Sequence, residues 1–208
     1  MNTEIMVSIQ CLAYNHEKYI RKALDGFVMQ KTNFKFEVIV HDDASTDRTA
    51  DIIREYAKKY DFIKPIFQIE NQYSRNKMFI KEFIYPLMKG KYIAYCEGDD
   101  YWDDPNKLQI LYDYMNAHDK CSMCCHAYEN IEANTEKKLS EVHTLTKDGI
   151  IDIQKVIKYD NPTQLASQMF RKECVLNQPN IYYNRGIGDY TLLLHAATLG
   201  EIHYIDKI

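Results

Sequence analysis

The chain has 208 residues, with 26 lysines and arginines against 30 aspartates and glutamates, for a formal net charge of -4. This length suits one sizeable domain, and the charge offers neither the basic surface that nucleic acids require nor an acidic tail. No apolar run approaches the roughly 18 residues that span a bilayer, and the N-terminal segment lacks the pattern of a signal peptide. We therefore expect a cytoplasmic protein with no nucleic-acid partner.

The first half of the chain repeats a unit of strand, loop and helix. Its apolar runs predict strands over 5–12, 36–41, 63–69 and 92–96. Apolar residues at helical spacing predict helices over 17–30 and 49–60 and a third helix that ends near Met88. The strand runs show no clean alternation of apolar and polar residues, as expected of parallel strands that are covered on both faces.

This rhythm predicts an α/β fold, with a mostly parallel sheet and helices on both faces. Ligands of such sheets bind beyond the carboxyl ends of the strands. Three polar loops follow predicted strands there: one carries Tyr14 and Asn15, one carries Asp42 and Asp43, and one carries Asp99. We expect the three loops to meet at one edge of the sheet.

The pattern is looser in the second half. The predicted elements are a helix at 105–118, a strand at 121–129, a surface loop at 132–148, a turn at Asn161 and Pro162, a short strand at 168–170, a loop at 182–188, a helix at 189–199 and a strand at 203–205. Cys121, Cys124 and Cys125 favour a core strand over a zinc site, because no second pair of ligands has suitable spacing. We expect reduced, buried cysteines.

The segment 97–104 carries a cluster of carboxylates around Gly98. Its acidic residues are Glu97, Asp99, Asp100, Asp103 and Asp104. So many carboxylates repel one another unless a cation lies among them, and Mg²⁺ or Mn²⁺ are the natural partners of oxygen ligands. These ions commonly bring a phosphate with them. The alternative is a solvated acidic turn whose aspartates cap the next helix.

Four segments together resemble the family 2 glycosyltransferases. They are VSIQCLAYN (7–15), VIVHDDASTD (38–47), YCEGDDYW (95–102) and GDYTLLLHAATLG (188–200). The resemblance implies the GT-A fold, a Rossmann-like α/β domain that takes a nucleotide sugar and transfers the sugar with inversion. It implies a single domain over 1–208, with a nucleotide-sugar-binding half at 1–118 and an acceptor-side half at 119–208.

The resemblance also implies roles for single residues. The ring of Tyr14 matches the position that packs against the base, and Asp43 matches the one that hydrogen-bonds it. A carboxylate accepts well from a uracil or thymine imide, so UDP or dTDP is the expected nucleotide. The residues expected to bind the nucleotide sugar are Ala13, Tyr14, Asn15, Asp43, Asp99 and Trp102. For Trp102, a place in the donor pocket and a buried packing role stay equally open.

Asp99 and Asp100 match the metal motif of the family. One aspartate contacts the ribose and the next holds Mn²⁺ or Mg²⁺ against the diphosphate, so we expect Asp99 and Asp100 as the metal residues. Glu97 stands where an aspartate is more usual, which leaves its share in the site open. In the loop 70–77 the sequence also departs from the family, and either Arg75 or Lys77 is left to meet the diphosphate.

Asp189 matches the catalytic base of the family, which removes a proton from the acceptor hydroxyl. A place at a helix start favours the ionised form that a base requires. An ordinary helix-capping aspartate has the same placement, so this role comes from the resemblance.

The resemblance thus implies a metal-dependent, inverting glycosyltransferase in surface polysaccharide or glycan synthesis. Its partners would be a nucleotide-sugar donor and a glycan or lipid-linked acceptor, and peripheral association with the inner face of the membrane is compatible with this. One alternative is a sugar nucleotidyltransferase, although the chain has only seven glycines and no glycine-rich phosphate loop. Another is a non-catalytic relative that binds nucleotide sugars.

Overall fold

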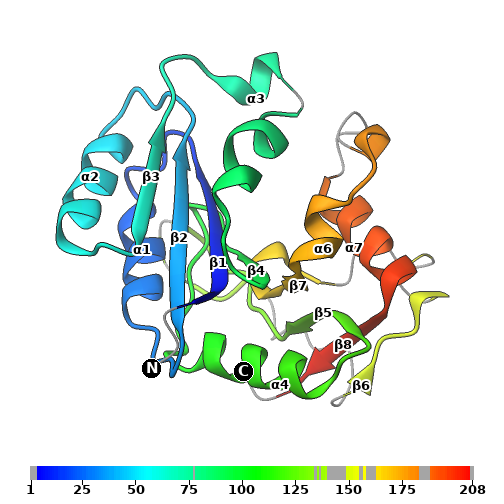
Figure 1. Ribbon diagram of the computed structural model, residues 1–208. Helices are drawn as coiled ribbons and strands as arrows, with labels where there is room; N and C mark the ends of the chain where they lie inside the picture. The colour runs from blue at the N-terminus through cyan, green and yellow to red at the C-terminus, as the bar shows by residue number, and fades with distance from the viewer. Residues whose placement is uncertain are drawn as a thin grey trace.

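The computed structural model describes residues 4–76, 78–133, 135, 137–139, 149–154, 157, 163–182 and 188–206. Within these residues, one sheet has the strand order β3-β2-β1-β4-β7-β5-β8-β6 (Figure 1). The strands are β1 (Ile5–Ala13), β2 (Lys35–Asp42), β3 (Ile63–Phe67), β4 (Tyr92–Tyr95), β5 (Cys121–His126), β6 (Gly149–Ile150), β7 (Met169–Arg171) and β8 (Glu201–Ile205).

Helices cover both faces of this sheet. They are α1 (Ile20–Val28), α2 (Thr49–Lys59), α3 (Gln72–Arg75), α4 (Lys107–Ala117), α6 (Lys172–Leu176) and α7 (Gly188–Leu199). One core cluster joins α1, α2 and α4 to the sheet through residues such as Leu24, Ile53 and Leu111. A second cluster on the other face contains Val175 of α6 and Leu193 of α7. The predicted α/β layering is confirmed.

The parallel half of the sheet is also as predicted. β1 lies between β2 and β4 and is parallel to both, and β2 is parallel to β3. β7 is different, because it lies between β4 and β5 and is antiparallel to each of them. This insertion places the segment 163–168, which leads into β7, beside the carboxyl end of β4, where Tyr95 N donates to Gln168 O at 3.4 Å.

Three parts of the prediction differ from the structure. The helix expected to end near Met88 is a π-helical turn (Ile80–Ile84) followed by a 3₁₀ turn (Tyr85–Leu87). Pro86 lacks the N–H that an α-helix needs at this point. The loop expected at 70–77 contains the short helix α3, and β6 and α6 were not predicted. The turn at Asn161 and Pro162, and most residues of the loops at 132–148 and 182–188, lie outside the described residues.

All six cysteines are buried and free, as predicted. Cys121, Cys124 and Cys125 belong to β5, so the interpretation of this segment as a core strand is confirmed. In the described part of the chain, no helix is long and apolar enough to cross a membrane.

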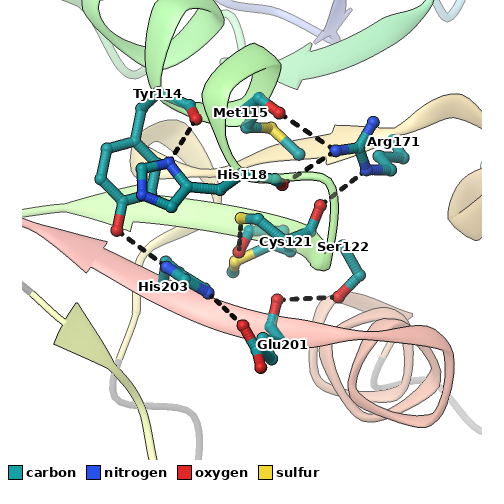
Figure 2. A network of polar contacts seen from close by, with 9 residues as sticks. Tyr114, Met115, His118, Cys121, Ser122, Arg171, Glu201 and His203 are labelled. Carbon is teal, nitrogen blue, oxygen red and sulfur yellow. Dashed lines mark hydrogen bonds and ion pairs between the residues drawn. The ribbon is translucent and has the colours of Figure 1, made fainter.

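A polar network joins the amino ends of β5 and β8 to the end of α4 (Figure 2). The guanidinium of Arg171 donates to the backbone oxygens of Met115, His118 and Cys121 at 2.7 to 3.0 Å. His203 lies between Tyr114 and Glu201, with contacts of 2.8 and 3.0 Å. This network fixes the end of the sheet that lies opposite the carboxyl end of β4.

Candidate active site

Three loops meet at the carboxyl ends of β1, β2 and β4. Gly98 N, after β4, donates to Leu12 O of β1 at 2.8 Å, and Asp43 N, after β2, donates to Ala13 O at 2.9 Å. Because parallel neighbours end at the same edge of the sheet, the three polar loops share one rim. The expected convergence is confirmed.

The first loop is tied to the second by Asn15. This residue has a φ of 56°, in the left-handed region that asparagine tolerates better than most residues. Its N–H donates to Ser45 Oγ at 2.9 Å, and its Oδ1 accepts from Thr46 N at 2.8 Å. Ala13 is buried at the end of β1, whereas the side chain of Tyr14 is 46% exposed at the rim.

The carboxylate of Asp43 is buried beneath the first turn of α3. Its two oxygens accept from Gln72 N at 2.6 Å and from Tyr73 N at 2.9 Å. Asp43 therefore attaches the segment 70–76 to the end of β2, and its carboxylate keeps further lone pairs free. Of the two cations considered for the diphosphate, Arg75 forms an ion pair with Glu70, and Lys77 lies outside the described residues.

The acidic turn after β4 holds Glu97, Asp99 and Asp100. Burial raises the pKa of Glu97 to about 7, with further contributions from the charges of Asp99, Asp100 and Asp189. Burial also raises the pKa of Asp100, against a hydrogen bond from Gln164. Asp99 is exposed, and its Oδ2 lies 3.8 Å from His16 Nε2.

The close packing of this turn favours glycine at position 98. A Cβ added to Gly98 would lie 2.8 Å from the His16 ring and 3.1 Å from the Cβ of Ala13.

Further along, Asp104 Oδ1 accepts from Asn106 N at 2.7 Å, immediately before α4. Asp104 thus closes a turn before the helix and does not cap it, because the N-cap residue of α4 is Asn106, which has no side-chain cap.

The carboxylates of this turn suit a hard cation, because Mg²⁺ and Mn²⁺ prefer oxygen ligands. Among the described residues, no three side chains of His, Cys, Asp or Glu are grouped so that they could hold a metal by themselves. Asp99 and Asp100 would therefore supply part of a coordination shell that a bound ligand and water complete, which is usual for Mg²⁺.

Asp189 is an exposed residue in the first turn of α7. It comes from the far end of the sequence, yet its charge is one of the causes that raise the pKa of Glu97. A carboxylate able to accept a proton thus lies within electrostatic range of the acidic turn.

Trp102 is packed rather than open to solvent. Its ring is 5% exposed and meets Phe27 edge to face, with the ring centroids 5.2 Å apart. Its Nε1 donates to Ala166 O at 2.9 Å. The packing role is thus confirmed; Trp102 also borders a cavity, and its place in the donor pocket stays a prediction.

This cavity has a volume of about 660 Å³ and is lined in part by Asp99, Asp100, Trp102, Lys107, His126 and Gln164. The last three are not among the site residues predicted from the sequence. Gln164 Nε2 donates to Asp100 Oδ2 over a long 3.5 Å. Burial lowers the pKa of Lys107 to about 7 and holds the pKa of His126 well below its usual range.

The sequence does contain a pattern that indicates a buried Lys107. Lys107 lies four and eight residues before Leu111 and Met115, so it shares their face of α4, and all three are buried. Gln164 and His126 carry no such signal, because they depend on how β7 enters the sheet: Gln164 lies in the segment before β7, and His126 ends β5, which pairs with β7.

Comparison with known proteins gives matches at the levels of family, sequence and structure. The family model described as Glycosyl transferase family 2 matches residues 8–178. An uncharacterized protein of Mycobacterium tuberculosis is 44% identical over 121 residues, which are 58% of this chain and 34% of that relative. The Escherichia coli UDP-Glc:alpha-D-GlcNAc-diphosphoundecaprenol beta-1,3-glucosyltransferase WfaP is 34% identical over 97 residues, 47% of this chain and 36% of that relative.

Among solved structures, residues 1–349 of S. aureus TarS in complex with UDP superpose with a TM-score of 0.73 at 19% identity. The match covers 98% of this chain and 59% of that chain. The matched region is thus only about a third of the length of these two curated relatives.

Proposed function

Because the chain belongs to glycosyl transferase family 2 and has the GT-A fold, we propose that it transfers a sugar from a nucleoside diphosphate donor to an acceptor hydroxyl, with inversion at the anomeric carbon. The observation that carries the proposal is that the polar loops after β1, β2 and β4, the last of them the acidic turn, meet at one rim of the sheet. UDP in the TarS structure and UDP-Glc in the name of WfaP support a UDP-linked donor.

Tyr14 and Asp43 are the residues that we propose for the base. The half-exposed ring of Tyr14 offers a face on which a base can stack. The Asp43 carboxylate retains lone pairs that can accept from a pyrimidine imide N–H, in addition to its two contacts with α3. UDP and dTDP both present this imide, so they are the expected nucleotides.

Asp99 and Asp100 are the residues that would hold Mn²⁺ or Mg²⁺, and Asp99 would also contact the ribose. A bound cation of this kind supplies Lewis-acid stabilisation of the charge on the leaving nucleoside diphosphate. Burial raises the pKa of Glu97 to about 7, and repulsion from the charges of Asp99, Asp100 and Asp189 adds to this rise. A cation that relieves this repulsion is therefore favoured.

Asp189 would act as the base. It accepts the proton of the acceptor hydroxyl while the oxygen forms a bond to the anomeric carbon, and the electron pair of the broken bond stays on the diphosphate. This direct displacement requires no enzyme nucleophile, and it places the incoming hydroxyl opposite the nucleotide. General base catalysis of this kind contributes about 10²- to 10⁴-fold.

The name of WfaP, in which the acceptor is a sugar on diphosphoundecaprenol, favours a lipid-linked or glycan acceptor. We therefore propose a part in surface polysaccharide synthesis at the cytoplasmic face of the membrane. Release of pyrophosphate instead of a nucleoside diphosphate would favour the nucleotidyltransferase alternative. Binding of a nucleotide sugar without any donor hydrolysis or transfer would favour the non-catalytic relative.

A thermal-shift panel tests the donor class. UDP-, dTDP-, GDP- and CMP-sugars are each added with and without Mn²⁺, because a ligand that binds the native state stabilises it by about 2.7 kcal/mol at a hundred times its Kd. We expect UDP- or dTDP-sugars to raise Tm, and to raise it further with Mn²⁺. A panel in which no nucleotide sugar changes Tm would contradict the proposal.

A further inference from the structure

Lys107 is a lysine with almost no access to solvent. Its side chain is 2% exposed, at the first residue of α4. The ammonium donates to Ala166 O and lies 4.0 Å from the centre of the Trp102 ring. Burying an ammonium is costly unless it is well partnered, so these two contacts define where the side chain lies.

The same carbonyl accepts from a second donor. Trp102 Nε1 donates to Ala166 O at 2.9 Å, so the acidic turn and α4 both hold this oxygen. Ala166 belongs to the segment 163–168, which the insertion of β7 places beside the carboxyl end of β4. Lys107 therefore links α4 and the adjacent acidic turn to a segment that is distant in sequence.

The segment 163–168 contacts the acidic turn before Ala166 and the end of β4 after it. Before it, Gln164 Nε2 donates to Asp100 Oδ2 at 3.5 Å. After it, Gln168 O accepts from Tyr95 N at 3.4 Å. Both of these contacts are long, whereas the Ala166 carbonyl between them accepts hydrogen bonds from two donors. These two hydrogen bonds thus fix the position of the segment against the acidic turn.

We propose that Lys107 is a positioning residue for the acidic turn: through Ala166 and Trp102 it holds Asp99 and Asp100 where a metal and a nucleoside diphosphate bind. It acts without contact to substrate. This inference rests on the proposed function, since it assigns to Lys107 a part in the site already proposed for the donor.

The two possible roles of Lys107, through its charge or through its position, predict opposite changes in the affinity for a cation. The positive charge faces the acidic turn and opposes the rise in the pKa of Asp100. If Lys107 acted through its charge alone, its removal would remove a repulsion toward Mn²⁺ and strengthen cation binding. If it positions the turn, its removal weakens binding. The direction of the change separates the two.

The test compares Lys107→Met with Lys172→Met in the full chain. Lys172 is the matched control, because its Nζ also donates to a backbone carbonyl, Met88 O at 2.7 Å, but away from the acidic turn. Calorimetric titration measures the affinity for UDP in the presence of Mn²⁺. The chain has one tryptophan, so its emission reports on Trp102 during the same titrations.

We expect Lys107→Met to fold with an equal or higher Tm, because apolar replacement of a buried charge is often neutral or stabilising. We expect its affinity for UDP with Mn²⁺ to fall about ten-fold, since a displacement near 1 Å in a site can cost up to about 10²-fold. The emission of Trp102 should shift, and Lys172→Met should match the wild type in affinity and emission.

Lys107→Arg keeps a charge and a donor, and we expect it to recover part of the lost affinity. It also keeps the inference testable if Lys107→Met does not fold, because an arginine variant with unaltered Tm but still weaker binding would support positioning by the lysine. If Lys107→Met binds UDP with Mn²⁺ as tightly as the wild type or more tightly, the positioning role of Lys107 is wrong, but the proposed function still stands. A wild type that binds no UDP with Mn²⁺ would contradict the proposed function as well.

Discussion

The charge of Asp189, in the first turn of α7, acts on Glu97 at the end of β4. Burial is the first cause that raises the pKa of Glu97 to about 7, and the charges of Asp99, Asp100 and Asp189 follow. Two segments from opposite parts of the sequence therefore share one electrostatic environment.

Asp100→Asn should weaken the binding of UDP in the presence of Mn²⁺ by roughly ten-fold, or about 1.4 kcal/mol. The substitution keeps the shape of the side chain and removes the charge that attracts the cation. Calorimetric titrations with and without Mn²⁺ measure the effect. Asp119→Asn, an exposed aspartate beyond α4, is the control. Equal metal-dependent affinities in wild type and Asp100→Asn would rule out Asp100 as a metal residue.

Tyr14→Ala should lower the affinity for UDP about ten-fold, because stacking of a base on an aromatic ring contributes about 1–3 kcal/mol. Stability should change by less than about 0.5 kcal/mol, since the side chain is 46% exposed. Leu199→Ala, with an exposed side chain at the end of α7, is the control. Undiminished UDP affinity in Tyr14→Ala would show that the ring does not bind the base.

Lys107 should give the protein a specific dependence of stability on pH. The pKa of Lys107 is lowered by burial from 10.5 to about 7 in the folded protein. Below pH 7 both the folded and unfolded states carry the proton, and the full cost of the buried charge is present. Between about pH 7 and 10.5 the unfolded state binds more protons, so the free energy of unfolding rises with pH.

Lys107→Met removes this dependence. We expect the variant's advantage in the free energy of unfolding to be largest near pH 6 and to shrink by roughly 3–5 kcal/mol toward pH 10. Urea denaturation of both proteins at several pH values measures it. Parallel stability curves for the two proteins would contradict a lowered pKa at Lys107.

Arg171→Met should destabilise the fold by about 2–4 kcal/mol, because three backbone carbonyls lose their donor. These are the oxygens of Met115, His118 and Cys121, at the end of the sheet opposite the acidic turn (Figure 2). Denaturant titration measures the loss. UDP affinity below the unfolding transition should stay at the wild-type value, and a loss of affinity without a loss of stability would contradict this purely structural role.

The sequence predicted the fold best where local pattern and tertiary structure agree. β1 and β2 are long, apolar runs with polar loops after them, and their pairing follows from the parallel rhythm. β7 has three residues and pairs antiparallel with strands from elsewhere in the chain. A run that short has no detectable period, so its place between β4 and β5 depends on contacts that the sequence does not display.

The candidate site also contains residues that local sequence pattern could place and residues that depend on tertiary contacts. Tyr14, Asp43 and the acidic turn directly follow strong strand signals, so their loops could be placed at one rim. Gln164 reaches Asp100 only because β7 enters the sheet beside β4. The capping of α3 by Asp43 was also not predicted, since it depends on the position of the third loop in space.

The release of UDP from a UDP-sugar donor by the wild type and by Asp189→Asn, with Mn²⁺ and acceptor present, tests the base assignment most directly. Asparagine keeps the shape of the side chain but cannot accept the proton. We expect release to fall by at least about 10²-fold while the affinity for UDP stays within about two-fold of the wild type. Equal rates of release in the two proteins would show that Asp189 is not the base and would contradict the proposed mechanism.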